Sequence, residues 1–256
     1  MLIRQTAPVI GAAGRSYDRP GEWSVNFAVR ALRSDTHFRE AERQVEREEE
    51  RTFVINRQFA ADLMIAYAFT GRLSVGVGVP FIAASWSIPT PTSPVPGPRA
   101  QQDARGIGDI SASMRYWLLD TKTHDRSNIA MRVGVKLPTG EYGAQDRLPD
   151  RNGENHELRY VDQSIQPGDG GFGIELGLEG FRQMGKVQLF GSGSYLINPR
   201  DTNGTPSISV SRLPPGVPPS PSSAGRLVNS VPDQYLARVG TAVPVMKVAV
   251  ASLAFR

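Results

Sequence analysis

The sequence contains no cysteine and no long apolar run. Without cysteine, the 256 residues can form neither a disulfide framework nor a thiolate metal site. The mean hydropathy is −0.29, and no segment approaches the ~20 apolar residues that a membrane-spanning helix needs. The formal net charge of +4 is scattered and lacks the basic stripe of a nucleic-acid binder. These absences exclude a helical membrane protein, and we expect no nucleic-acid partner.

Turn-forming residues, in contrast, are abundant. The chain has 26 glycines and 20 prolines without a collagen-like period, which is typical of β structure with many turns and loops. Between the turns, apolar and polar residues alternate with period two, as Trp23, Val25 and Phe27 do. About nine strands are predicted, over residues 23–33, 59–69, 73–81, 109–118, 128–137, 172–178, 187–195, 235–243 and 247–255.

The connections between these strands alternate in length. Short turns are predicted near residues 71, 120–126, 185 and 246, and long polar loops over residues 34–51, 86–105, 139–166 and 198–232. Outer-membrane barrels show this asymmetry, and their strands of about 9 to 11 residues match the predicted lengths. We therefore predict an all-β fold, an antiparallel up-and-down transmembrane β-barrel. A soluble sheet with one solvated face would explain the alternation but not the rhythm of the loops.

If the apolar faces contact lipid, the charged residues of opposite parity must point into the lumen. Both signs occur among them, which indicates either a lumen laced by ion pairs or a pore lined by opposing patches. The candidates for lumen-facing, permeation-controlling residues are Arg30, Asp62, Asp109, Arg115, Arg132, Lys136, Glu175, Glu179 and Arg238.

The histidines give no sign of catalysis. His37, His124 and His156 lie in predicted loops or turns, and no motif pairs any of them with a serine or a second ligand. We therefore expect that the protein is not an enzyme.

Three loop segments deserve a chemical interpretation. The glycine-rich run 168–173 opens a strand, not a helix, and lacks the Lys-Ser/Thr ending of a phosphate-binding loop. Residues 150–154 and 201–204 place oxygen ligands beside glycine but match no complete calcium loop, so turn chemistry explains them better. Residues 39–51 mix charges at spacings that allow a short solvated helix in an outer loop. We expect no cofactor and no metal.

Several short motifs resemble those of a known family. They are Gly106–Asp109, Tyr116–Asp120, Gly134–Gly140, Asp162–Gly171, Ser194–Pro199 and Val231–Tyr235. In this order they resemble the outer-membrane transporters of the meta-pathway of phenol degradation. The resemblance implies a barrel with long outer loops that passes small hydrophobic or aromatic compounds, and it carries over no catalytic residue. The partners it implies are these solutes, outer-membrane lipid and lipopolysaccharide, in a Gram-negative envelope.

The two ends depart from this pattern. We interpret residues 1–21 as an N-terminal periplasmic segment without a recognisable signal peptide, and residues 22–256 as a barrel domain that is incomplete at its C-terminus. Nine strands are an odd number, whereas single-chain bacterial barrels use an even one, so we expect a truncated barrel.

The predicted function is an outer-membrane channel for passive passage. The alternatives are a structural or receptor-type envelope barrel whose loops bind a partner, a soluble β protein with a ligand pocket and, last, an enzyme. The oligomeric state is not predicted.

Overall fold

A computed structural model describes residues 17–39, 41–89, 99–149, 156–211, 213, 218, 227–246 and 249–255 of the chain. Its main sheet has ten strands. They are β1 (Trp23–Ser34), β4 (Ile55–Ala68), β5 (Leu73–Pro89), β6 (Arg99–Ile107), β7 (Ser111–Trp117), β8 (Ser127–Lys136), β11 (Gly173–Met184), β12 (Val187–Ile197), β15 (Gln234–Met246) and β16 (Ala249–Phe255).

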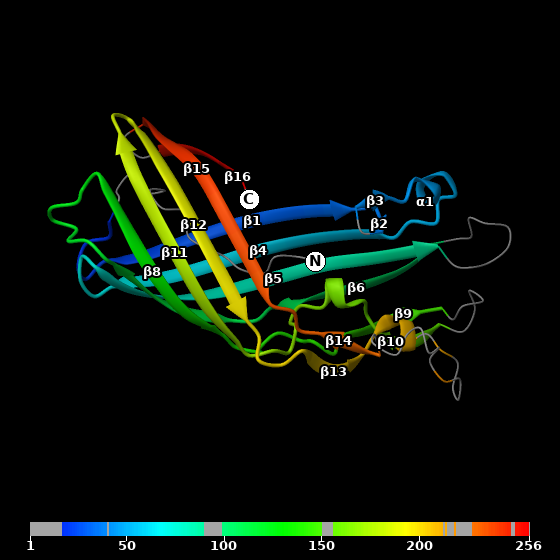
Figure 1. Cartoon of the computed structure of the whole chain (residues 1–256). Coiled ribbons are helices and arrows are strands. Elements are labelled where there is room, and N and C mark those ends of the chain that lie inside the picture. The colour runs from blue at the N-terminus through cyan, green and yellow to red at the C-terminus, as the bar shows by residue number, and fades with distance from the viewer. Residues whose placement is uncertain are drawn as a thin grey trace.

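The sheet is antiparallel and runs up and down. Its order is β1-β4-β5-β7-β8-β11-β12-β15-β16, and β6 pairs with β5 beside this path. Figure 1 shows the sheet curled into a half-barrel, with β1 and β16 as its two edges. Within the described residues, these edges do not pair with each other. The predicted all-β, up-and-down architecture is confirmed, and the nine predicted strands correspond to the nine strands of the path.

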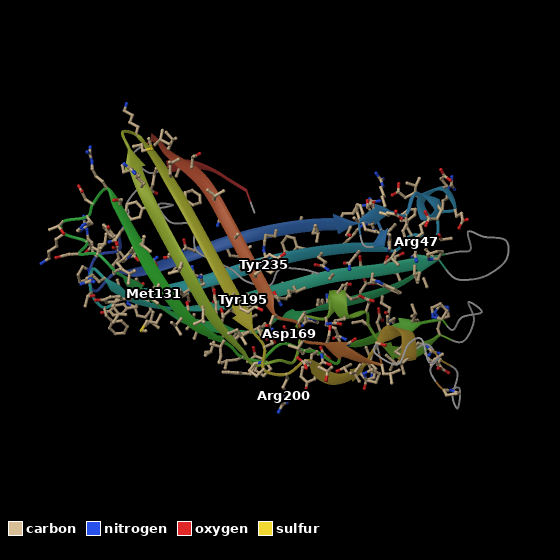
Figure 2. The ribbon with its side chains drawn as sticks, in the orientation of Figure 1. Arg47, Met131, Asp169, Tyr195, Arg200 and Tyr235 are labelled. Atoms are coloured by element: carbon tan, nitrogen blue, oxygen red, sulfur yellow. The ribbon has the colours of Figure 1, made fainter. Side chains whose placement is uncertain are left out.

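The convex face of the sheet is apolar and uncovered. Trp23 and Phe27 in β1 are 67% and 69% exposed, and in β11 Leu178 is 56% exposed. Figure 2 draws further exposed side chains of this kind, among them Met131, Tyr195 and Tyr235 on β8, β12 and β15. The register aligns such residues across strands, for example Phe27 with Leu63. No second sheet packs on this face in the described part of the chain, so the alternation does not mark a sandwich core.

The short turns gather at one end of the strands. In the β4–β5 turn, Thr70 Oγ1 accepts hydrogen bonds from the backbone N–H groups of Arg72 and Leu73 at 3.1 and 2.9 Å. Gly185, between β11 and β12, has φ of +61°, a conformation that glycine adopts without steric cost. These turns lie where the sequence places them.

The prediction of a loop over residues 86–105 is wrong for residues 86–89 and 99–105. β5 continues to Pro89, and β6 returns along it with Ser85 opposite Asp103. Because the outward positions of β6 are polar, such as Gln101 and Arg105, the segment lacks the one-sided apolar pattern used to find strands. Only residues 90–98 of this connection lie outside the described residues.

The other long connections contain short elements. They are β2 (Phe38–Arg39), β3 (Glu42–Arg43), the helix α1 (Val45–Glu49), β9 (Gln145–Leu148), β10 (Glu157–Tyr160), the 3-10 helix η1 (Gln163–Ile165), β13 (Thr202–Pro206), α2 (Ile208–Ser211) and β14 (Val228–Ser230). The helix α1 confirms the short helix expected within residues 39–51, whereas the possible ligand segment 150–154 lies outside the described residues. None of the described helices is long and apolar enough to cross a membrane.

The core of the molecule lies inside the curl. Leu148, Val161 and Ile165 from the β8–β11 connection are fully buried and form a cluster with residues of β5 such as Ile82 and Trp86. This connection was predicted as a long polar loop on the outer side of the membrane. Its apolar residues fold over the concave face and pack against β5, a position that the sequence alone does not predict.

Candidate functional site

The concave face carries a charged network across three neighbouring strands. Arg132 of β8 contacts Glu179 of β11 at 2.7 Å and Glu175 at 3.5 Å. Arg115 of β7 contacts Glu179 at 3.4 Å and Asp18 at 2.5 Å. Four of the nine predicted lumen-facing residues therefore meet in one cluster on the inner side of the sheet.

The strand register explains why this network needs Glu179 at its centre. Arg115 and Arg132 are direct cross-strand partners, and like charges in such positions destabilise a sheet. The Glu179 side chain is 1% exposed and accepts from both guanidinium groups, which offsets the repulsion. Gly134 lies beside the network and lets β7 and β8 approach closely, since a Cβ there would lie 2.9 Å from the carbonyl oxygen of Ala112 and from Ser113 Cβ.

Three further predicted residues lie on the concave face, away from this network. Arg30 of β1 and Asp62 of β4 form an ion pair at 2.8 Å. Arg238 of β15 lies over the ring of Phe190, 5.8 Å from its centroid. Charge pairing therefore extends along the inner wall from β1 to β11, and an arginine also faces inward on β15.

A buried aromatic cluster lies on the concave face near the short turns. Tyr17 packs edge-on against Trp117 and Phe181, with ring centroids 5.1 and 5.5 Å apart. Phe190 belongs to the same buried cluster. The Tyr17 hydroxyl donates to the carbonyl of His124, and the Asn128 side chain donates to this hydroxyl at 2.9 Å. Sequence reasoning missed Tyr17 and Asp18, because they precede β1 and carry no strand periodicity.

At the opposite end, Asp109 and Lys136 meet a partner that the sequence did not assign. Lys136 Nζ donates to both carboxylate oxygens of Asp169 and lies 4.0 Å from Asp109 Oδ2. Asp109 accepts from the backbone N–H of Gly140 at 3.0 Å and from that of Asp169 at 2.9 Å. Asp109 is not part of a strand as predicted, because β7 begins at Ser111. Burial and the charge of Asp169 raise the pKa of Asp109 to about 6, although Lys136 and the two N–H groups oppose this.

Three glycines let the backbone segments around this buried cluster approach each other. A Cβ on Gly140 would lie 2.7 Å from Gly168 Cα and 2.9 Å from Gly108 Cα, distances that real side chains do not adopt. The segment that follows is seated on the inner wall, where Gln58 of β4 donates to the carbonyl of Ser164 at 2.7 Å. The glycines and the charged cluster together fix the β8–β11 connection inside the curl.

A set of hydrogen bonds around Asp233 holds the β12–β15 connection. Asp233 accepts from the backbone N–H of Asn198 at 2.7 Å and from the Tyr195 hydroxyl at 2.9 Å. These two donors lower the pKa of Asp233. The Asn198 side chain also donates to the carbonyl of Pro232 at 2.6 Å. Asp169, Asn198 and Asp233 were not predicted as site residues, although each stands inside one of the quoted motifs.

The sequence itself matches no family model and no curated protein. Among solved structures, the chain is similar to an outer membrane channel from Pseudomonas putida F1, at 13% identity with a TM-score of 0.56, over 98% of this chain and 75% of that one. A FadL homologue from Pseudomonas aeruginosa is aligned at 11% identity with a TM-score of 0.37, over 91% of this chain and 56% of that one. The first similarity confirms that the fold is of the outer-membrane β-barrel type.

Proposed function

We propose that this chain forms the wall of an outer-membrane channel for the passive passage of small hydrophobic or aromatic compounds. One observation carries the proposal: the sheet has an uncovered, largely apolar convex face, whereas ion pairs join charged residues on its concave face. In water, such a face would be an unusually large apolar patch for a monomer. Against lipid tails it costs nothing, and the inner charges remain hydrated or paired.

This arrangement also proposes where the protein resides and what surrounds it. A sheet with this polarity belongs in the bacterial outer membrane, with lipid and lipopolysaccharide against its convex face. Charges of opposite sign on the inner wall argue against strong ion selectivity. We assign the nine lumen-facing candidates to permeation through this inner space, and we assign no catalytic role.

The class of solute is proposed from the motifs. The resemblance to the phenol meta-pathway transporters indicates small hydrophobic or aromatic compounds. The aromatic cluster around Trp117 and Phe181 and the apolar cluster around Ile82 and Trp86 are buried within the chain, so they belong to its packing and are not counted as a binding surface for the solute.

Reconstitution in lipid vesicles tests the proposal. For each solute, uptake by vesicles with the protein is compared with uptake by protein-free vesicles. We expect the protein to increase the uptake of a small aromatic solute more than that of a sugar of similar size. In cells, the protein should fractionate with the outer membrane. Recovery in the soluble fraction without detergent, or a lack of both conductance and aromatic uptake, would contradict the proposal.

One observation favours a second candidate, a structural or receptor-type envelope barrel. The β8–β11 connection is seated inside the curl, and a lumen filled in this way could be closed to solutes. Such a barrel would insert into the outer membrane and resist unfolding, yet pass no solute. The vesicle experiment therefore separates the two candidates.

A further inference from the structure

The convex face changes character toward the end that carries the long connections. Across β1, β4, β5 and β6, successive outward rows run from apolar to basic. The first row is Val29, Ala61, Phe81 and Ile107, the second is Ala31, Phe59, Ala83 and Arg105, and the third is Arg33, Arg57, Ser85 and Asp103. Three arginines therefore stand directly beyond the apolar belt, at the level where a membrane exchanges its acyl chains for headgroups.

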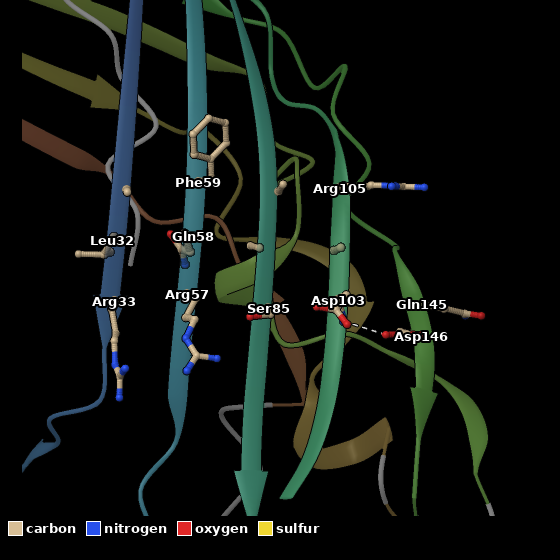
Figure 3. Close-up of a pocket in the computed structure, with 14 residues that line it drawn as sticks. Leu32, Arg33, Arg57, Gln58, Phe59, Ser85, Asp103, Arg105, Gln145 and Asp146 are labelled. Atoms are coloured by element: carbon tan, nitrogen blue, oxygen red, sulfur yellow. Dashed lines mark hydrogen bonds between the residues drawn. The ribbon is translucent and has the colours of Figure 1, made fainter.

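These arginines line a groove of about 940 Å³ on this part of the sheet. In Figure 3, Arg33 and Arg57 extend side by side from neighbouring strands, and Phe59 lies farther from the strand ends. Arg105 borders the groove on β6. The groove thus combines a cationic rim with an apolar floor formed by residues such as Ala31 and Phe59.

The charges in the groove are poorly compensated by the protein itself. Arg33 and Arg57 are direct cross-strand partners, and like charges so placed destabilise a sheet. Arg33 has an exposed ion pair with Asp35 at 2.9 Å. Within the described residues, Arg57 and Arg105 have no ion-pair partner, although both are exposed.

Two carboxylates also line the groove, but other groups engage them. Asp103 accepts from the side-chain amide of Gln101 at 3.1 Å. Asp146 accepts from the backbone N–H groups of Asp103 at 2.7 Å and of Arg147 at 2.8 Å. Both carboxylates keep their negative charge, but within the described residues neither forms an ion pair with Arg57 or Arg105, whose guanidinium groups can therefore contact a further anion.

Among the strands whose side chains are described, β8, β11, β12 and β15 do not continue this basic rim. At the same end of β8, β11, β12 and β15, the outward residues are apolar or aromatic, namely Val135, Ile174, Tyr195 and Tyr235. Arginines that served only to keep the protein soluble would be spread around the whole rim. A local cluster of arginines above an apolar floor instead fits a ligand with an anionic head and apolar tails.

We propose that this groove binds a phosphate group of lipopolysaccharide, the phosphorylated glycolipid of the outer leaflet. A guanidinium group can donate two parallel hydrogen bonds to phosphate oxygens, and in the described part of the chain no carboxylate pairs with Arg57 or Arg105. The acyl chains of the same lipid extend over Phe59 and the apolar row below it. The proposal deepens the proposed function and rests on it, since it requires that the convex face contact the membrane.

Binding of purified lipid A to the detergent-solubilised protein, followed by native mass spectrometry, tests this site. We expect R57Q/R105Q to bind bisphosphorylated lipid A about tenfold more weakly than the unchanged protein, because two charge-assisted contacts are lost at an exposed site. R57K/R105K should fall between the two, since lysine keeps the charge but not the paired geometry. The matched control is R182Q, which removes an exposed arginine on the same face at the short-turn end.

Several outcomes would overturn the proposal. They are equal binding of lipid A by R57Q/R105Q and the unchanged protein, equal binding of dephosphorylated lipid A, and an equal loss in R182Q. A dimer of the chain that forms without lipid and dissociates in R57Q/R105Q would assign the groove to a second copy instead. Inorganic phosphate should compete only weakly, because it lacks the acyl chains. Outer-membrane fractionation and solute uptake are measured separately, so a failure of the lipid site leaves the channel proposal standing.

Discussion

At the scale of single residues, the inner wall depends on the carboxylate of Glu179. It lies between two arginines that would otherwise repel each other, and its side chain is 1% exposed. E179Q removes the charge and keeps the shape. We expect a loss of about 3 kcal/mol in the free energy of unfolding, because Arg115 and Arg132 each lose one of two carboxylate partners and keep only Asp18 and Glu175, respectively. Chemical denaturation in detergent measures this loss.

Glu175 provides the control for that prediction. Its contact with Arg132 is longer, at 3.5 Å, and its side chain is 13% exposed. E175Q should therefore cost distinctly less stability than E179Q. Equal losses in the two variants would show that Glu179 is not the centre of the network.

Asp109 makes the stability of the loop end depend on pH. Its pKa is about 6 in the folded chain, against an ordinary value of 3.8, so between these values the folded state holds more protons than the unfolded state. Stability is therefore expected to fall as the pH rises through this window. Thermal unfolding of the unchanged protein and of D109N, followed from pH 4 to pH 7, measures the effect. D109N should reduce this pH-dependence, whereas an identical slope in both proteins would count against it.

The candidate site was predictable from sequence only in part. The alternation of side chains along each strand assigned Arg115, Arg132 and Glu179 to one face of the sheet, because this alternation does not depend on the neighbouring strands. It could not pair them, because pairing depends on the register between strands. Asp169 escaped entirely, since it lies in a loop whose path is set by Gly140 and Gly168 packing together.

At the scale of elements, the β8–β11 connection lies on the inner wall, where it can limit the passage of solutes. Gly168 of this connection packs closely against Gly140, and a single added methyl group would disturb this contact, because a Cβ on Gly168 would lie 2.8 Å from Gly140 Cα. We expect G168A to shift this connection and to raise the conductance of reconstituted protein. Single-channel recording in planar bilayers measures the change. If G168A conducts like the unchanged protein, the connection does not limit passage.

Gly106 serves as the matched control for this substitution. It lies near the same connection, but a Cβ there would meet only Pro167 at 3.5 Å, an ordinary van der Waals contact. G106A should leave conductance unchanged. A rise equal to that in G168A would mean that any added methyl group disturbs this region.

The motifs quoted for the family resemblance acquire a shared structural meaning at this scale. Asp109, from one of them, accepts hydrogen bonds from Gly140 and Asp169 of two others, and Asp233 accepts one from Asn198 of a further motif. The motifs thus mark the places where long connections are fastened to strand ends.

By contrast, β6 was missed because outward positions beyond the apolar belt are polar, which removes the signal on which strand prediction depends.

At the scale of the whole molecule, the curl separates two environments. Apolar side chains such as Phe27, Leu178 and Tyr235 stand uncovered outside, and paired charges, aromatic rings and a folded connection occupy the inside. Burying the outer face in water would require another protein layer, whereas lipid satisfies it directly. The channel proposal and the lipid site both depend on this separation.

Quenching of tryptophan fluorescence by lipids with brominated acyl chains tests this separation most directly. Trp23 is 67% exposed on the convex face, whereas Trp117 is 2% exposed inside the curl. Two single-tryptophan proteins, W86F/W117F and W23F/W86F, report on these positions separately after reconstitution. Strong quenching of Trp23 with little quenching of Trp117 is expected if lipid covers the convex face. Equal quenching at both positions, or none at Trp23, would contradict it.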